Sequence, residues 1–416
     1  MADILRRLGR EVLVVDGAMG TMLQRAGIPA GIAPELLNTT AEDVVGEIHR
    51  NYVLAGADCV TSNSFGGSRA KLAEHGLEDQ VEALNRAAVR LALASGALHV
   101  LADVGPTGLV LEPLGSALFD ELYEMFAEQV AALAAASPDA IIIETMTEIA
   151  EARCAVLAAR SVTDLPVFAT ATFGLSGRMD LSGTGPEEAA IILEAAGASA
   201  VGMNCGLGPE QMLPLVERMA LATALPLIVQ PNAGLPRLED GVTVFPGTAD
   251  EMGTFAARFV DAGAAVVGSC CGSTPVFTGA IADFAKDKPV VLRERAAGVV
   301  IAGPRGSVRI GGGAPLAVVG ERINPTGKKA LAESLRSGSM SLVREYAAAQ
   351  QEQGAAALDV NVGAAGVDAV STLPEAVKAV VSTADLPVVI DTTDPAALAA
   401  ALRVYPGRAL INSVNG

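Results

Sequence analysis

The 416-residue sequence has few aromatic residues, few cysteines and no excess of basic residues. Aromatic side chains make up 3% of it, so its core must consist of Ala, Val, Leu and Ile. The formal charge of −18 argues against nonspecific binding to nucleic acid or anionic membranes. No apolar run reaches the roughly 18–20 residues of a membrane span, and the start does not resemble a signal peptide. Five cysteines do not suggest a disulfide framework, so we expect a reducing cytoplasm.

Residues 1–285 contain a repeated alternation of a short apolar run, a turn rich in Gly, Asn and Thr, and a helical stretch. This alternation is typical of βα units with a parallel sheet. Eight strands are expected, at residues 12–16, 59–63, 100–104, 140–144, 167–172, 200–204, 227–230 and 265–268. Eight βα units predict a (βα)8 TIM barrel. A doubly wound sheet is the alternative, but no Gly-x-Gly-x-x-Gly follows the first strand.

Residues 286–313 are rich in Gly, Arg and Lys and predict a linker with a short hairpin. The βα rhythm restarts in residues 314–416, with strands expected at 316–320, 357–360, 387–390 and 409–411. The expected fold class is therefore α/β: a TIM barrel, a linker and about half of a second TIM barrel. Four βα units cannot close a barrel. We therefore expect that the chain is truncated or that a partner completes it, and we favour truncation.

Three of the five cysteines come where predicted strands of the barrel end. They are Cys205 and the adjacent pair Cys270 and Cys271. Because the carboxyl ends of TIM-barrel strands converge on one face, we expect these thiols on neighbouring strands there. Three thiolates can hold zinc with an open fourth position, an electron-rich site suited to binding a substrate thiol. The alternative is burial as small side chains, which we expect for Cys59 and Cys154.

Four other polar residues of the barrel are candidates for substrate binding. Asp16 and Glu144 end apolar strands, where a carboxylate is costly to bury without a partner. They are suited to hold a substrate ammonium group, and the alternative is that they cap turns. Thr61 and Asn63 are suited to bind a substrate carboxylate, or else satisfy loop backbone. We assign no role to the histidines.

A cluster of amide and carboxylate side chains is expected at the strand ends of the second module. Its members are Asn324, Asp359, Asn361, Asp391 and Asn412. Together such side chains present donors and acceptors to a planar heterocycle. Turn formation is the alternative for each one taken alone.

Several motifs resemble those of a known family. Residues 16–24 (DGAMGTMLQ), 204–210 (NCGLGPE), 230–234 (QPNAG) and 268–275 (GSCCGSTP) resemble the homocysteine-binding barrel of the cobalamin-dependent methionine synthase family. Residues 320–327 (GERINPTG) and 359–361 (DVN) resemble the pterin-binding barrel of the same family. The order of the two modules is more specific than either module alone.

The resemblance implies roles for the candidate residues. It implies that Cys205, Cys270 and Cys271 bind zinc, which activates the homocysteine thiol, and that Asp16 and Glu144 hold the amino-acid end of homocysteine. The five Asn and Asp residues of the second module are implied to line a methyltetrahydrofolate pocket. In the family the methyl group passes from the folate to cobalamin and then to homocysteine, in methionine biosynthesis. We therefore expect methylcobalamin to be bound by another domain or subunit, and folate to bind this chain weakly or not at all.

Three other functions fit part of the same sequence. A cobalamin-independent homocysteine methyltransferase, using a betaine or sulfonium methyl donor, would carry the same three cysteines but needs no pterin module. A fusion to a folate-reducing barrel is a related possibility without a flavin-site signature to support it. A noncatalytic zinc-binding barrel is the alternative from a different class.

Overall fold

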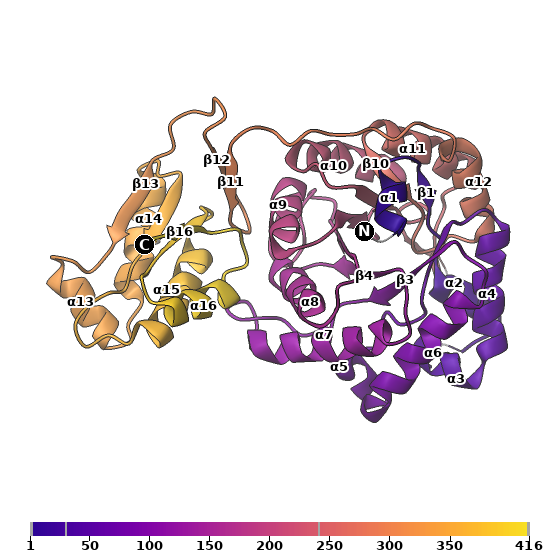
Figure 1. The fold of residues 1–416 in the computed structure, drawn as a ribbon, viewed down its shortest axis with the longest axis horizontal. Helices are drawn as coiled ribbons and strands as arrows, with labels where there is room; N and C mark the ends of the chain where they lie inside the picture. The colour runs from indigo at the N-terminus through magenta and orange to yellow at the C-terminus, as the bar shows by residue number, and fades with distance from the viewer. Residues whose placement is uncertain (1–2, 30, 240–241, 414–416) are drawn as a thin grey trace.

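A closed ring of parallel strands forms the larger part of the computed structural model, which describes residues 3–29, 31–239 and 242–413 (Figure 1). The strands are β1 (Leu13–Val14), β2 (Cys59–Thr61), β3 (His99–Val104), β4 (Ala140–Met146), β5 (Val167–Ala171), β6 (Ala200–Asn204), β7 (Leu227–Gln230) and β10 (Ala264–Val267). They pair in the order β1-β10-β7-β6-β5-β4-β3-β2, and a parallel bridge between Val15 and Cys59 closes the ring. The predicted TIM barrel is confirmed, and each strand lies within two residues of its expected bounds.

One large helix follows each strand and packs on the outside of the ring. These helices are α4 (Glu42–Leu54), α6 (Val81–Leu93), α7 (Phe119–Ala134), α8 (Ile149–Val162), α9 (Pro186–Ala196), α10 (Pro209–Ala222), α11 (Ala249–Asp261) and α12 (Pro275–Ala285). In α11 the buried residues Met252, Ala256 and Phe259 recur at helical spacing, which gives one apolar face toward the strands. Among the described residues, no helix has both the length and the apolar character needed to cross a membrane.

Shorter elements complete the barrel. They are α2 (Met19–Arg25), α3 (Leu37–Thr40), α5 (Arg69–Ala73), the 3-10 turns at Pro34–Leu36 and Glu78–Gln80, and the hairpin of β8 (Arg237–Glu239) and β9 (Val242–Val244). Helix α1 (Asp3–Leu8) lies at the centre of the ring in Figure 1. Its buried Ile4 and Leu8 pack with inward-facing strand residues such as Leu101 and Phe168. This helix therefore closes the amino-terminal end of the barrel.

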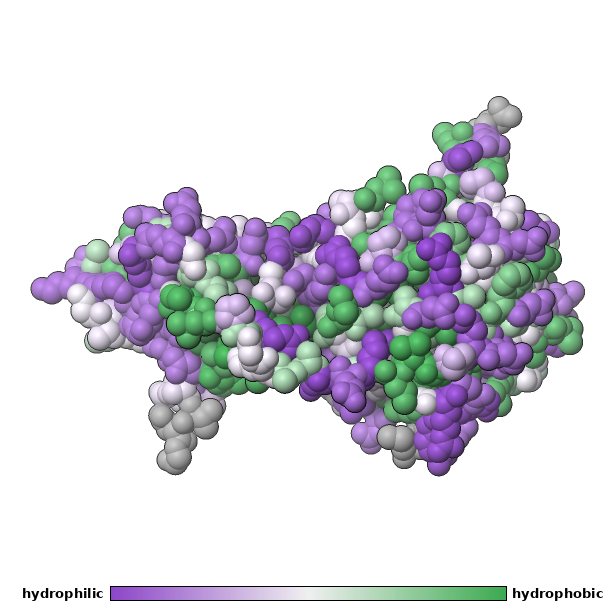
Figure 2. Space-filling view, turned by 90° about the horizontal axis from the view of Figure 1, so that it is seen from above, coloured by the Kyte–Doolittle hydropathy of each residue, from purple (hydrophilic) through white to green (hydrophobic). Residues whose placement is uncertain are grey.

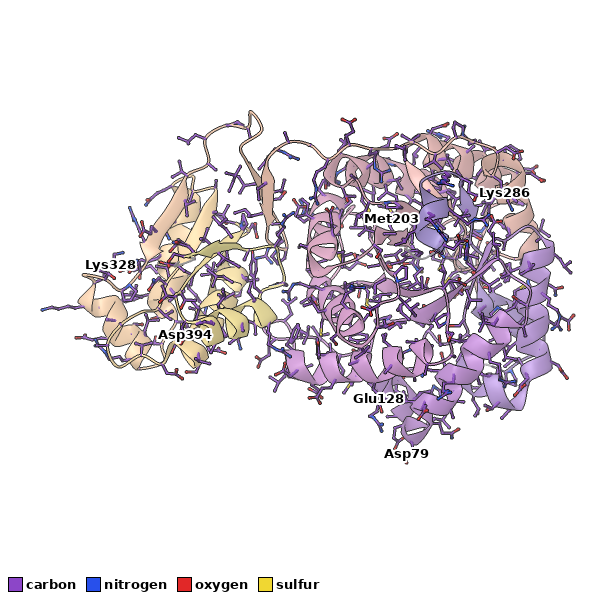
Figure 3. The ribbon with its side chains drawn as sticks, viewed as in Figure 1. Asp79, Glu128, Met203, Lys286, Lys328 and Asp394 are labelled. Carbon is purple, nitrogen blue, oxygen red and sulfur yellow. The ribbon has the colours of Figure 1, made fainter. Side chains whose placement is uncertain are left out.

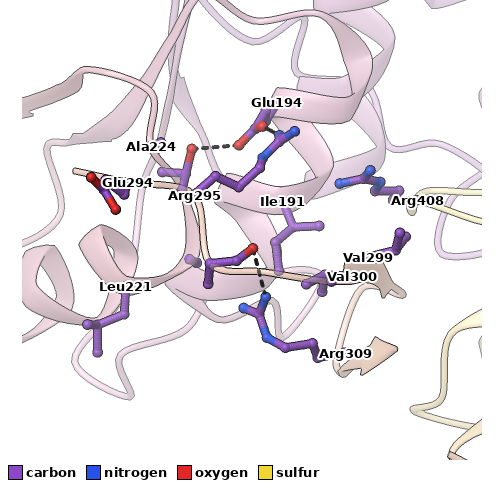
Figure 4. Close-up of a pocket in the computed structure, with 14 residues that line it drawn as sticks. Ile191, Glu194, Leu221, Ala224, Glu294, Arg295, Val299, Val300, Arg309 and Arg408 are labelled. Carbon is purple, nitrogen blue, oxygen red and sulfur yellow. Dashed lines mark hydrogen bonds and ion pairs between the residues drawn. The ribbon is translucent and has the colours of Figure 1, made fainter. Parts of the chain in front are cut away.

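The connector to the second module is fixed to the barrel by paired charges. At its start stands Lys286, labelled in Figure 3. Its Nζ lies 2.7 Å from Asp58 Oδ1. Further on, Arg295 pairs with Glu194 of α9 beside a small cavity (Figure 4). Within the connector itself, the Arg309 side chain donates to the carbonyl of Ala297 at 3.0 Å. The hairpin expected in this segment is present, as antiparallel β11 (Val299–Ala302) and β12 (Ser307–Ile310).

The second module is an open sheet of four parallel strands in the order β13-β14-β15-β16. The strands are β13 (Val319–Ile323), β14 (Ala357–Val360), β15 (Val388–Asp391) and β16 (Leu410–Asn412). Helices α13 (Lys329–Arg336), α14 (Ser341–Glu352), α15 (Ala369–Thr383) and α16 (Pro395–Val404) connect them. The first strand does not begin at residue 316 as predicted. Val319 is its first residue with a partner, Ala357 of β14, whereas Leu316 is 94% exposed.

The two modules contact each other along α7 and α8 of the barrel and α15 and α16 of the second module, and form one elongated body (Figure 2). Arg403 of α16 pairs with Asp120 and lies 5.1 Å from the ring centroid of Phe119. Arg153 donates to the Leu402 carbonyl at 2.8 Å. These contacts are mostly polar, whereas the β11–β12 hairpin adds apolar contacts to both modules through Ala302 in the barrel core and Ile301 in a cluster with β14 and β15.

Candidate metal and substrate site

The three predicted metal ligands meet at the carboxyl end of the barrel. The sulfur atoms of Cys205, Cys270 and Cys271 all lie within 4.8 Å of one another. A tetrahedral zinc with Zn–S distances of about 2.3 Å separates its sulfur ligands by about 3.8 Å. The observed Cys205 to Cys271 distance of 3.9 Å matches this spacing. The other two cysteines, Cys59 in β2 and Cys154 in α8, are buried away from the cluster.

The strands that carry the thiols are not neighbours, contrary to the prediction. Strand β7 lies between β6 and β10 in the ring. The loop after β7 joins the two sides, because the Gln230 carbonyl accepts from the Cys205 amide at 3.0 Å and the Pro231 carbonyl from the Cys270 amide at 2.8 Å. The thiols therefore meet across the end of β7, on a backbone that this loop holds in place.

The chain turns sharply at the end of β6. Cys205 has φ 59°, a left-handed conformation that is uncommon for residues other than glycine. Gly206 follows with φ 70°, and a Cβ there would lie 2.6 Å from the carbonyl oxygen of Phe173. A side chain at position 206 would therefore clash as well as strain the backbone. This strained turn places the Cys205 thiol in the wall of a cavity at the carboxyl end of the barrel.

Asn204 supports this turn and was missed by the sequence analysis as a site residue. It is fully buried, and its Oδ1 accepts from the Thr145 amide and from the Thr170 hydroxyl, both at 2.8 Å. Its Nδ2 donates to the Thr145 hydroxyl at 2.7 Å. The carboxamide thus ties the end of β4 to the end of β6. The signal in the sequence was an Asn directly before a candidate ligand.

The three thiols share hydrogen bonds, which makes them an electron-rich group. Hydrogen bonds from Cys270 and then Cys271 lower the pKa of Cys205. The same sharing, first with Cys205, raises the pKa of Cys270. Three thiols this close together have the chemistry of a site for a thiophilic cation.

A cavity of about 420 Å³ opens beside the thiols. Glu144 lines it, and burial, then the charges of Asp16 and Cys205, raise the pKa of Glu144 to about 8. Asp16 lies behind this wall and is 2% exposed. Burial raises its pKa to about 7, although hydrogen bonds from Thr61 act in the opposite direction.

The two residues predicted to bind a substrate carboxylate also hold parts of the chain together. The Thr61 hydroxyl donates to Asp16 Oδ1 at 3.0 Å, and the Thr61 amide donates to Oδ2 at 2.9 Å. Asn63 Nδ2 donates to the Pro34 carbonyl at 2.7 Å and to Asn38 Oδ1 at 2.9 Å. Both residues line the cavity, but these donors already have partners within the chain.

The second module brings four of its five candidate residues together. Asn361 Nδ2 donates to Asp391 Oδ2 at 2.8 Å, and Asn412 Nδ2 donates to Asp359 Oδ2 at 3.2 Å. The fifth residue, Asn324, accepts from the backbone amide two positions further on at 3.0 Å, which forms a local turn. Lys328 Nζ, labelled in Figure 3, donates to the carbonyl of Asn324 at 3.2 Å.

The closed barrel and its three thiols define a class of TIM-barrel proteins with a cluster of three thiols at the carboxyl end of the strands. Within that class, residues 13–285 match the family model "Homocysteine S-methyltransferase", and the chain belongs to this family. Residues 320–416 match the model "Pterin binding enzyme".

Relatives and a solved structure agree with this assignment. The chain is 31% identical over 437 aligned residues to the methionine synthase of Mycobacterium tuberculosis and 29% identical over 445 to that of Mycobacterium leprae. Both alignments cover 99% of this chain, but the chain spans only 36% of each relative's length. The metallated homocysteine methyltransferase MmuM from Escherichia coli shares the barrel fold, with a TM-score of 0.56 and 24% identity. That match covers 65% of this chain and 95% of MmuM.

Proposed function

We propose that this chain is a homocysteine S-methyltransferase that activates the thiol of homocysteine on zinc held by Cys205, Cys270 and Cys271. The observation that carries the proposal is the convergence of three sulfur atoms within 4.8 Å at the wall of an open cavity. Zinc bound there would keep the substrate sulfur deprotonated, so that the sulfur attacks a methyl carbon. The chain's own residues hold the sulfur and orient the rest of the amino acid, with Asp16 and Glu144 toward its ammonium group.

The proposed methyl donor is methylcobalamin carried by a separate domain or subunit, with methyltetrahydrofolate as the upstream donor in methionine biosynthesis. The pterin-binding family match over residues 320–416 supports the folate. So do the two Asn–Asp pairs at the strand ends of the second module, which offer donors and acceptors to a planar ring. Asn324 would complete this pocket from the turn after β13.

Metal analysis combined with a spectroscopic titration tests the proposal. We expect about one zinc per chain, and in the cobalt-substituted protein we expect homocysteine to change the absorption spectrum by adding a sulfur ligand. A protein that binds metal but shows no spectral change with homocysteine would support a noncatalytic zinc-binding barrel. A protein that binds no metal would contradict both functions.

The choice of methyl donor needs a separate assay. The zinc-loaded chain is supplied with homocysteine and either methylcobalamin, glycine betaine or S-methylmethionine, and methionine is measured. Methionine from methylcobalamin alone is the expected result. Methionine from the betaine or the sulfonium compound would favour the cobalamin-independent alternative, against the pterin-binding match.

A further inference from the structure

Asp103 is a buried carboxylate of the barrel to which neither the sequence motifs nor the proposed chemistry gives a role. It lies in β3, is 5% exposed and lines the same cavity as Glu144 and the thiols. Its Oδ1 is buried without a hydrogen-bond partner among the described residues. Leaving such a group unpaired is costly, so a ligand is the expected partner.

The direction of the Asp103 side chain follows from the alternation along β3. Val100, Ala102 and Val104 belong to the core between strands and helices, whereas Leu101 belongs to the cluster inside the ring. Asp103 is two residues beyond Leu101 and so faces inward as well. In β4, Glu144 stands in the same relation to the inward-facing Ile142. The two carboxylates therefore face the barrel interior from adjacent strands, at its carboxyl end.

A second buried aspartate in the same barrel shows what a structural carboxylate looks like here. Asp58, before β2, is 8% exposed. One oxygen accepts from the Val14 amide at 3.0 Å and the other lies 2.7 Å from Lys286 Nζ. Asp58 is thus paired at both oxygens. The contrast indicates that Asp103 does not serve the fold in the way Asp58 does.

The charges around Asp103 favour a cation in the cavity. Asp103 and Glu144 line one cavity wall with Asp16 behind it, and burial, then the Glu144 and Asp16 carboxylates, raise the pKa of Asp103. The lysine that lines the cavity, Lys71, already pairs with Glu74 at the rim at 2.7 Å. A cationic ligand bound between these carboxylates would therefore relieve their mutual repulsion.

We propose that Asp103 is a specificity-determining residue that, with Glu144, selects thiol substrates carrying a primary ammonium group. A primary ammonium group has three N–H donors and no acceptor, so it can bond to both open carboxylates at once. Asp16 lies behind the cavity wall and adds negative charge there. Each of the two Asp16 carboxylate oxygens already accepts one hydrogen bond from Thr61. The inference rests on the proposed function, because the substrate sulfur must lie at the three cysteines.

Two thiols that differ only in the ammonium group test this inference. The metal-loaded full chain is titrated calorimetrically with L-homocysteine and with 4-mercaptobutyrate, which lacks the amino group. The variant Asp103→Asn removes the charge and keeps the shape. We expect it to weaken homocysteine binding about tenfold to a hundredfold, as for loss of a hydrogen bond to a charged group, and to leave 4-mercaptobutyrate binding unchanged.

Two further variants make the result specific. Asp103→Glu keeps the charge and should retain most of the preference for homocysteine, even if Asp103→Asn proves unstable. Glu217→Gln makes the same charge change at an exposed position of α10 that does not line the cavity, and should keep the wild-type preference. A preference that is unchanged in Asp103→Asn, or lost equally in Asp103→Glu, overturns the role of Asp103. A wild-type chain that binds metal but neither thiol overturns the proposed function itself.

Discussion

The two modules carry similar polar residues at the same place, the carboxyl ends of parallel strands, but in different environments. In the closed barrel, Asp103 and Glu144 face a cavity, and Asp103 Oδ1 is buried without a hydrogen-bond partner among the described residues. In the open sheet, Asp359 and Asp391 each accept a hydrogen bond from an asparagine of a neighbouring strand. Closing the ring surrounds the strand ends with protein on all sides.

This difference in enclosure changes the electrostatics of the carboxylates at the strand ends. Burial raises the pKa of Glu144 to about 8 in the barrel and that of Asp359 only to about 6 in the sheet. Desolvated groups interact more strongly with a bound charge than groups that water can reach. Four experiments separate the two regions, in order of decreasing expected effect.

The largest expected effect is on the metal of the barrel. Replacing Cys271 by serine removes one of three thiolates, so the zinc content should fall from about one per chain to near zero. Cys154→Ser is the matched control, because it removes a buried thiol of α8 that is remote from the cluster, and it should keep the metal. The molar ratio of zinc to protein is measured by atomic emission spectroscopy after gel filtration. A C271S protein with a full complement of zinc would contradict the ligand assignment.

The next effect is on the acid stability of the barrel. Burial lowers the pKa of His49 to about 4, and neither ring nitrogen has a hydrogen-bond partner among the described residues. In the unfolded chain histidine has a pKa of about 6.5, so between about pH 6.5 and pH 4 His49 is protonated in the unfolded state but not in the folded barrel. The free energy of unfolding therefore falls as the pH drops through this range. The loss should approach about 3 kcal/mol.

His49→Leu should remove this acid-dependent loss, whereas His75→Gln at an exposed site should retain it. Hydrogen exchange measured between pH 7 and pH 4.5 reports the barrel and the second module on separate peptides. Because all three histidines lie within residues 1–285, the substitution should change the pH dependence of barrel peptides alone. An equal pH dependence in H49L and the wild type would exclude His49 as the cause.

Much of this arrangement could be predicted from the sequence, because strand period and strand order determine which ends converge. The closed barrel and the meeting of Cys205 with the cysteine pair followed from strand ends alone. That β7 lies between their strands follows from strand order, but the backbone hydrogen bonds by which its loop joins them have no local signal. Asp103 was missed because it lies inside an apolar run, where only the inward direction of its side chain gives it meaning.

The third effect is on the stability of the second module. The Tyr405 hydroxyl accepts from the Val388 amide at 2.9 Å and donates to the Ala302 carbonyl at 3.0 Å, which joins β15 to the hairpin. Tyr405→Phe leaves that buried amide without a partner and should destabilise the module by about 1–3 kcal/mol. Amide hydrogen exchange in second-module peptides should become faster, while the exchange rates of barrel peptides should stay unchanged. Tyr346→Phe, at a half-buried ring, is the control and should have little effect. Equal exchange in Y405F and the wild type would refute the argument.

The smallest expected effect is on the contact between the modules. Arg403 pairs with Asp120 and lies 5.1 Å from the ring centroids of Phe119 and Tyr123, but its side chain is 46% exposed. Exposed ion pairs contribute about 0.2–1 kcal/mol, and salt screens them. Asp120→Asn should therefore destabilise the contact by less than about 1 kcal/mol at low ionic strength and by almost nothing at 1 M salt. The readout is the exchange rate of α16 peptides against that of β14 peptides in the same protein. A loss of stability in Asp120→Asn that persists at 1 M salt would mean that the direct hydrogen bonds from Arg403 to Asp120, rather than screened charge attraction, hold this contact, whereas no loss at any salt concentration would mean that stacking on the two rings holds Arg403.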